Sequence, residues 1–150
     1  MKNSLQIIQT NEQNYLPIIY FLRGLVFQKE IGHSFVDIEQ DYESTTVHFL
    51  LKNQNEYLGC LSLVQEDFET LKAHRIRALA IYPKFQHQGL GTILLKAAIT
   101  YWKQKEKTNI LWLSSLEKTI LFYQKNKFTC YEQLYLRDID GWSQKMIMKK

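Results

Sequence analysis

The sequence FQHQGLG, from Phe85 to Gly91, places two glycines one residue apart, directly before a segment with helical periodicity. The chain contains only 6 glycines, and glycine weakens the interior of a helix by about 1 kcal/mol relative to alanine. A glycine pair at the start of a helix therefore indicates that the backbone comes close to another group there. Unpaired N–H groups and the helix dipole at such a start favour an anion such as phosphate.

The residues on both sides of this turn predict a strand, a helix and a second strand. Before the turn, HRIRALAIY (residues 74–82) has the composition of a strand. After it, apolar residues recur at helical spacing from Leu90 to Tyr101, and NILWLS (residues 109–114) is typical of a buried strand. A helix of this length can join two parallel strands. The sequence thus predicts a strand–glycine turn–helix–strand unit.

The remaining segments extend this unit into an α/β fold, a mixed central β-sheet flanked by helices, in a single domain over residues 1–150. SQKMIMKK (residues 143–150) is expected to be an edge strand that could pair between subunits of a homodimer. GHSFVDIEQDYES (residues 32–44) is read as a polar, acidic loop. The other predicted elements are a strand at residues 5–9, a helix at 13–29, a hairpin at 46–64, a short helix at 116–126 and a strand at 127–136.

Composition limits the possible classes of protein. The two cysteines, Cys60 and Cys130, lack the spacing of metal ligands, so no metal site is expected, and a chain with so few thiols suits the cytoplasm. No stretch has the length of a membrane span or the apolar core of a signal peptide. The net charge is +4, and only KAHRIR (residues 72–77) and the final KK are clustered. A solvated surface is therefore favoured over a nucleic-acid interface.

Two common phosphate-binding patterns do not fit the turn. A P-loop ends in Gly-Lys-Ser/Thr, and a dinucleotide-binding turn has three spaced glycines and a later acidic residue. The pattern Gln86-x-x-Gly89-x-Gly91 after a strand instead resembles the acyl-CoA loop of the GNAT superfamily of N-acetyltransferases. LFYQKNKF (residues 121–128) resembles the Phe-Tyr segment of that family, and LRGLVFQKE, the acidic loop and VHFLL resemble its small bacterial single-domain members.

This resemblance implies a GNAT fold and an acetyl-CoA-dependent N-acetyltransferase that acts on a primary amine of a small molecule or peptide. Acetyl-CoA is the expected co-substrate, with no metal, no nucleic acid and no membrane involved. The turn would present backbone amides to the pyrophosphate, and the preceding strand would pair with pantetheine. The implied cofactor-binding residues are Leu79, Ala80, Ile81, Gln86, His87, Gln88, Gly89, Leu90, Gly91 and Thr92.

Two departures from the family pattern have consequences. Asn126 is taken to replace the glycine that follows the Phe-Tyr pair, and asparagine tolerates a left-handed helix end better than most residues. Leu116 stands where many relatives have an asparagine seven residues before the tyrosine. A side-chain contact to pantetheine is therefore expected to be missing.

Acyl transfer to an amine needs a neutral nitrogen, a polarised carbonyl and a proton for the thiolate. The resemblance makes Tyr123 the catalytic acid, whereas the helical pattern alone would make it a core tyrosine. Ser114 and Ser115 either line the acceptor site or cap the next helix. The acidic loop either attracts a cationic acceptor or is solvated surface. Candidates for a base, none preferred, are Asp37, Glu39, Asp41, Glu43, His33, His48, Glu66 and Asp67.

Two functions outside catalysis remain open from the sequence. The first is a binding module that keeps the CoA loop but senses acyl-CoA without turnover. The second is a basic RNA-binding domain, against which the chain lacks an aromatic-rich strand or a glycine–lysine loop suited to nucleic acid.

Overall fold

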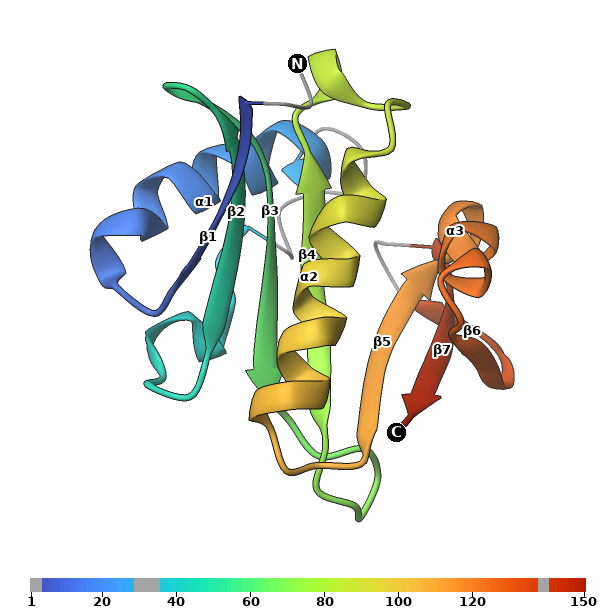
Figure 1. Ribbon diagram of the computed structural model, residues 1–150. Helices are drawn as coiled ribbons and strands as arrows, with labels where there is room; N and C mark the ends of the chain where they lie inside the picture. The colour runs from blue at the N-terminus through green and yellow to red at the C-terminus, as the bar shows by residue number, and fades with distance from the viewer. Residues whose placement is uncertain (1–3, 29–35, 138–140) are drawn as a thin grey trace.

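The computed structural model describes residues 4–28, 36–137 and 141–150. Its strands are β1 (Leu5–Thr10), β2 (Val47–Asn53), β3 (Glu56–Gln65), β4 (His74–Ile81), β5 (Ile110–Leu116), β6 (Thr129–Arg137) and β7 (Gly141–Lys149). They form one sheet in the order β1-β2-β3-β4-β5-β7-β6 (Figure 1). Only β4 and β5 are parallel among these neighbours, since every other adjacent pair is antiparallel. The predicted mixed α/β sheet is confirmed.

Helices cover both faces of this sheet. Helix α1 (Leu16–Arg23) lies on one face, and α2 (Leu90–Lys105) and α3 (Ile120–Lys125) lie on the other (Figure 1). Helix α2 connects the parallel strands β4 and β5, as the glycine turn predicted. Shorter helical turns lie between these elements: η2 (Gln13–Tyr15), η3 (Gly24–Gln28), η4 (Glu39–Tyr42), η5 (Pro83–Phe85) and η6 (Glu117–Thr119).

The helix predicted for residues 13–29 is divided into η2, α1 and the π-helical turn η3. Pro17 lies in the first turn of α1, where its missing N–H has no helical partner to lose. Gly24 follows α1 in a right-handed helical conformation, with φ −61 and ψ −38, and begins the π-helical turn η3. Residue 29 lies outside the described residues.

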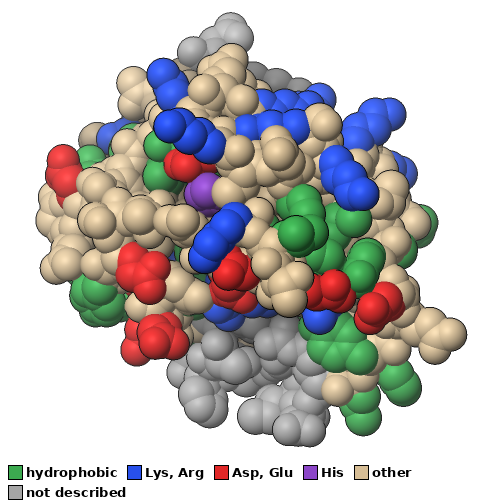
Figure 2. Space-filling model, turned by 90° about the horizontal axis from the view of Figure 1, so that it is seen from below, with side chains coloured by type: hydrophobic (Ala, Val, Ile, Leu, Met, Phe, Trp, Pro, Cys, Tyr) green, Lys and Arg blue, Asp and Glu red, His purple; other side chains and the backbone are tan. Residues whose placement is uncertain are grey.

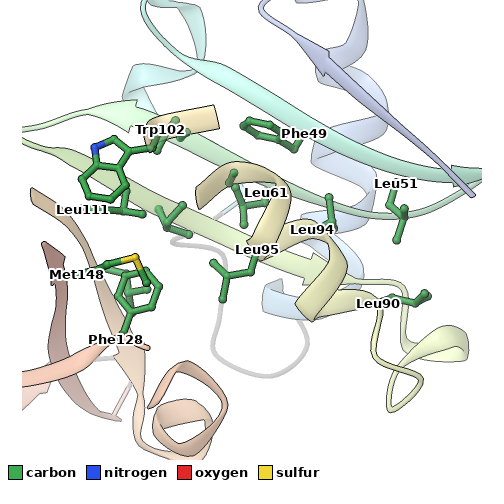
Figure 3. Close-up of a cluster of buried hydrophobic side chains, with 14 of the residues drawn as sticks. Phe49, Leu51, Leu61, Leu90, Leu94, Leu95, Trp102, Leu111, Phe128 and Met148 are labelled. Carbon is green, nitrogen blue, oxygen red and sulfur yellow. The ribbon is translucent and has the colours of Figure 1, made fainter. Parts of the chain in front are cut away.

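Two apolar clusters hold the layers together. Leu90, Leu94, Leu95 and Trp102 of α2 point toward the sheet and pack against side chains of β2 and β3 (Figure 3). On the other face, α1 packs against β2, β3 and β4 through a smaller cluster. Each cluster fixes one helix to the central strands, so β4 is held from both sides.

The C-terminal strand lies inside the sheet. Strand β7 pairs with β5 on one side and with β6 on the other, so the expectation that SQKMIMKK forms an edge strand is wrong. Met146 and Met148 of β7 are buried in the core, which explains the central position. The edge strand at this end is β6, and pairing of subunits through β7 is therefore excluded.

The left-handed residue after α3 is Lys127, with φ +74, and Asn126 has φ −96. The assignment of Asn126 to the glycine position is therefore wrong by one residue. Asn126 instead donates a hydrogen bond from Nδ2 to the carbonyl of Phe122 at 2.9 Å, which satisfies a carbonyl at the helix end. Lys127 carries the strain of a left-handed residue that is not glycine.

Acidic and basic side chains are interspersed over the lower end of the molecule (Figure 2). Among the residues that the structure describes, no helix is both long and apolar enough to cross a membrane.

Candidate active site

A cleft opens in the middle of the sheet, where β4 and β5 separate. These strands pair at only two positions, His74 with Leu111 and Arg75 with Trp112. Beyond Arg75, both strands are fully described and diverge, which leaves one edge of β4 without a strand partner. The cleft has a volume of about 640 Å³, and its walls are η3, β4, the turn after η5, the start of α2, the end of β5, η6 and α3.

A β-bulge in β4 changes which side chains face the cleft. Ala78 has φ +53, and the register between β3 and β4 shifts between Cys60 and Ser62, so Ala78 and Leu79 share one position opposite β3. Such a bulge disrupts the ladder and re-aims the side chains that follow. As a result, Leu79 and Ile81 pack on the α2 side and Ala80 packs on the α1 side.

The glycine turn has the geometry of an anion-binding loop. His87 and Gly89 both have left-handed backbones, with φ +64 and +82, and Gln86 donates from Nε2 to the carbonyl of Ile81 at 3.0 Å. Gly89 is the N-cap of α2, and the first helical bond runs from Ile93 N to its carbonyl at 3.3 Å. The N–H groups of residues 90–92 therefore precede the helical ladder and are open to a ligand.

Most of the residues that the resemblance assigns to the cofactor line this cleft. The side chain of Ala80 is instead fully buried against α1, and Gln88 is exposed outside the lining. The assigned residues that do line the cleft are Leu79, Ile81, Gln86, His87, Gly89, Leu90, Gly91 and Thr92.

Gly91 permits a close approach between α2 and α3. A Cβ atom at this position would lie 3.4 Å from Cζ of Phe122 and 3.9 Å from Cγ1 of Ile81, and all three residues line the cleft. These are ordinary van der Waals distances, so the fold itself tolerates a methyl group there. The glycine therefore keeps space open inside the cleft.

Tyr123 of α3 is half-buried and lines the same cleft. Its ring makes edge contacts with Phe122 and Phe128, at centroid distances of 5.0 and 6.0 Å. Burial raises the pKa of Tyr123 above its ordinary value, because the apolar surroundings disfavour the phenolate. The phenol is therefore protonated at neutral pH. The ring thus packs against its aromatic neighbours, as a core tyrosine would, and it also lines the cleft.

Arg75 and Arg77 line the α1 side of the cleft, and sequence reasoning missed them by treating KAHRIR as solvated surface. Nη1 of Arg75 lies 2.7 Å from Oε2 of Glu66, and its guanidinium stacks 4.3 Å above the ring of Trp112. Nη1 of Arg77 lies 3.3 Å from Oε1 of Gln40 and 3.8 Å from Glu66. The alternation Arg-Ile-Arg was the available signal, because side chains two apart on a strand share a face.

The two serines of β5 have different surroundings, although both line the cleft. Ser114 accepts hydrogen bonds from Tyr135 at 3.0 Å and, more weakly, from Arg75 at 3.4 Å, which places it beside the arginines. Ser115 donates to the carbonyl of Leu116 and contacts the hydroxyl of Thr119, both at 2.8 Å, and so stabilises η6. Ser114 thus lies beside the arginines of the cleft, and Ser115 belongs to the start of the next helical segment.

The acidic loop was interpreted either as solvated surface or as a region that attracts a cationic acceptor. Both interpretations are wrong for Asp41, which is buried and already paired. It forms a fully buried, two-bond ion pair with Arg23 of α1, at 2.7 and 2.9 Å, and accepts from Ile38 N at 3.1 Å. Arg23 also donates to Ser62 of β3 at 2.8 Å. The exposed acids of this segment, Asp37, Glu39 and Glu43, do not line the cleft.

None of the other proposed bases that the structure describes lines the cleft. His48 is buried beside Ser62 at 2.7 Å, and burial lowers its pKa. Asp67 forms an exposed ion pair with Lys72 at 3.4 Å, and Glu66 binds Arg75. His33 lies outside the described residues. No Asp or Glu occurs among the described residues of the cleft lining.

Neither cysteine lies in the cleft lining. Cys60 is buried and Cys130 exposed, and burial raises the pKa of the Cys60 thiol to about 12. Within the described ranges, no group of three or more His, Cys, Asp or Glu side chains is placed to hold a metal ion.

The sequence profile described as "Acetyltransferase (GNAT) family" matches residues 16–128. The chain belongs to the GNAT acetyltransferase family. The matched range includes the turn, the cleft walls and Tyr123. Among curated proteins, no significant sequence match is found.

Solved structures share the GNAT fold over nearly the whole chain. Escherichia coli ElaA has a TM-score of 0.81 at 18% identity, covering 97% of this chain and 99% of its own. A GNAT family acetyltransferase from Elizabethkingia anophelis with acetyl-CoA bound has a TM-score of 0.71 at 22% identity, with 99% of each chain covered. Spermidine N-acetyltransferase from Vibrio cholerae, in complex with CoA and spermine, has a TM-score of 0.74 at 14% identity, with 98% and 96% covered.

Proposed function

We propose that this chain transfers an acetyl group from acetyl-CoA to a primary amine of a small molecule or peptide, by direct attack of the amine on the thioester. The observation that carries the proposal is the left-handed turn at residues 86–89, which opens at the start of α2 onto the cleft where β4 and β5 separate. The GNAT neighbour with acetyl-CoA bound supports the choice of co-substrate.

Both backbone groups and side chains of the described residues would contact acetyl-CoA. The N–H groups of the turn and of the first turn of α2 would hold the pyrophosphate, with the hydroxyl of Thr92 as a further donor. The unpaired edge of β4 near Ile81 would pair with the pantetheine arm and donate to the thioester oxygen. Leu79, Ile81 and Phe122 provide apolar walls.

Acetyl-CoA, when bound, supplies a thioester carbon that accepts the amine nitrogen as the carbon–sulfur bond breaks. Tyr123 donates its phenolic proton to the departing sulfur. The described cleft lining contains no carboxylate and no cysteine, which supports proton loss from the amine to water and direct transfer without an acyl-cysteine.

The proposal is tested by thiol release from acetyl-CoA in the presence of amino acids, polyamines, aminoglycosides and short peptides, with mass spectrometry of the products. Acceptor-dependent thiol release and a product heavier by one acetyl group are expected. Tight acetyl-CoA binding without turnover on any acceptor would instead support the binding module.

Replacing Gly91 by alanine is expected to weaken acetyl-CoA binding at least about tenfold, the loss typical of a ligand that must shift around one methyl group, and to leave folding intact. The added methyl fits at van der Waals distance from Phe122 and Ile81 but occupies the cleft. Alanine in a helix is also favoured over glycine, by up to about 1 kcal/mol. Calorimetric titration and thermal unfolding measure the two effects separately.

The matched control is Thr100→Ala, which lies in the same helix on an exposed surface outside the cleft. Its affinity for acetyl-CoA should equal that of the wild type. Unchanged affinity in Gly91→Ala would show that the start of α2 does not contact the ligand. Gly89 is the poorer test, because its φ of +82 strains any substitution although a Cβ there would meet nothing within 4 Å.

A further inference from the structure

The charged side chains that line the described part of the cleft are cationic. Arg75 and Arg77 lie on β4, Lys118 lies on η6, and the lining includes no Asp or Glu. Glu66 is the carboxylate nearest the arginines, and these three groups, Arg75, Arg77 and Glu66, sum to one positive charge. The acceptor that the acidic loop suggested, a cation, would meet like charges in this cleft.

The arginines are held in defined positions. Arg75 is fixed by its 2.7 Å contact with Glu66 and by stacking on Trp112. Glu66 Oε1 also accepts from Gln40 Nε2 at 2.8 Å, and Gln40 in turn accepts from Arg77. Side chains positioned by such a network lose little freedom when a ligand binds. A guanidinium presents its N–H donors as a planar fork that matches a carboxylate.

The arginines and the glycine turn occupy opposite ends of the cleft. Arg75 belongs to the last paired position between β4 and β5, so it marks the closed end. Arg77 pairs with Ser62 and Ile81, next to the turn, pairs with Gly59, so the two residues are three positions apart along β3, or roughly 10 Å. Ser62, directly opposite Arg77, contacts Arg23 of α1, so Arg77 faces the α1 side whereas Ile81 faces the α2 side. The arginines are therefore separate from the groups that would hold pyrophosphate.

We propose that Arg77, supported by Arg75, binds a carboxylate of the acceptor, so that the acceptor class is a small amine that also carries a carboxylate, such as a free amino acid. This inference rests on the proposed acetyltransferase function. It assigns the α1 side of the cleft to the acceptor and selects against polyamines.

The test compares amine acceptors that carry a carboxylate with acceptors that lack one. Thiol release from acetyl-CoA is measured with several free amino acids, the corresponding amino acid amides, dipeptides and spermidine. The kcat/KM of a free amino acid is expected to exceed that of its amide by about tenfold or more, the typical value of a charge-assisted hydrogen bond. Amidation lowers the pKa of the neighbouring amine and increases its neutral fraction, so without carboxylate recognition the amide would be the better acceptor.

The Arg77→Gln variant should raise KM for the amino acid about tenfold or more and leave KM for acetyl-CoA and the kinetics of the amide nearly unchanged. Arg77→Lys keeps the charge but loses the fork, so its preference for the amino acid should be intermediate. Lys103→Gln removes one positive charge from an exposed position of α2 outside the cleft, and its preference should match the wild type.

The ratio of amino acid to amide kcat/KM separates recognition from folding, because a destabilised protein loses activity on both acceptors alike. Equal or better turnover of amides or spermidine by the wild type would overturn this inference and leave the acetyltransferase intact. An Arg77→Gln variant that raises KM for acetyl-CoA instead would assign the arginine to the cofactor. If none of these acceptors supported thiol release, the proposed function itself would be overturned.

Discussion

Replacing Tyr123 by phenylalanine is expected to lower kcat by at least about tenfold while acetyl-CoA binds with nearly unchanged affinity. A positioned general acid contributes about 10²- to 10⁴-fold, and the lower bound allows water to serve as a substitute donor. The variant loses one oxygen and keeps the ring contacts with Phe122 and Phe128. The pKa of Tyr123 is raised by burial, so loss of its proton should not limit the rate below about pH 10.

Tyr101→Phe is the matched control, because it removes a phenol hydroxyl from α2 at a position outside the cleft lining. Its kcat should equal that of the wild type. If Tyr123→Phe kept full kcat in an assay limited by chemistry, Tyr123 would have no part in proton transfer. Weaker acetyl-CoA binding with unaltered kcat would assign the hydroxyl to positioning of the co-substrate.

Asp41→Asn is expected to reduce the free energy of unfolding by about 3–5 kcal/mol, because it leaves the buried guanidinium of Arg23 without its counterion. Both side chains are fully buried, and they link α1 to η4 and, through Ser62, to β3. For a chain of this size the loss corresponds to a fall in Tm of about 6–20 °C. Urea denaturation followed by circular dichroism measures it.

A double replacement by apolar residues, Arg23→Met with Asp41→Leu, should cost less than the sum of the single changes, because it removes both charges together. Glu39→Gln is the control, since Glu39 is an exposed acid of the same turn. Its unfolding free energy should stay within about 0.5 kcal/mol of the wild type. An equally small effect of Asp41→Asn would show that the ion pair does not stabilise the fold.

Local pattern predicted the parts of the fold that depend on neighbouring residues. The glycine pair and the helical spacing after it were enough to predict β4, the turn, α2 and β5 in order. The position of β7 between β5 and β6 could not be predicted, because strand order depends on contacts between distant residues. The same holds for Arg23 and Asp41, which lie 18 residues apart and meet only after α1 packs on the sheet.

The lining of the cleft was predicted where it depends on backbone geometry and missed where it depends on the tertiary arrangement. The turn and Tyr123 follow from short motifs. The bulge at Ala78 has no signal in the sequence, because alanine is not a residue that favours φ +53. From the sequence, Arg75 and Arg77 were interpreted as surface charge. They line the cleft because β5 diverges from β4, and this divergence has no local signal.

The central claim, that the cleft between β4 and β5 binds acetyl-CoA through the turn at residues 86–91, is tested most directly by thermal unfolding with acetyl-CoA and with acetyl-pantetheine, which lacks the pyrophosphate. At about 100 times Kd, acetyl-CoA should stabilise the fold by about 2.7 kcal/mol, a rise in Tm of about 5–10 °C. Acetyl-pantetheine at the same concentration should raise Tm far less. No rise with acetyl-CoA, or an equal rise with both compounds, would contradict the account.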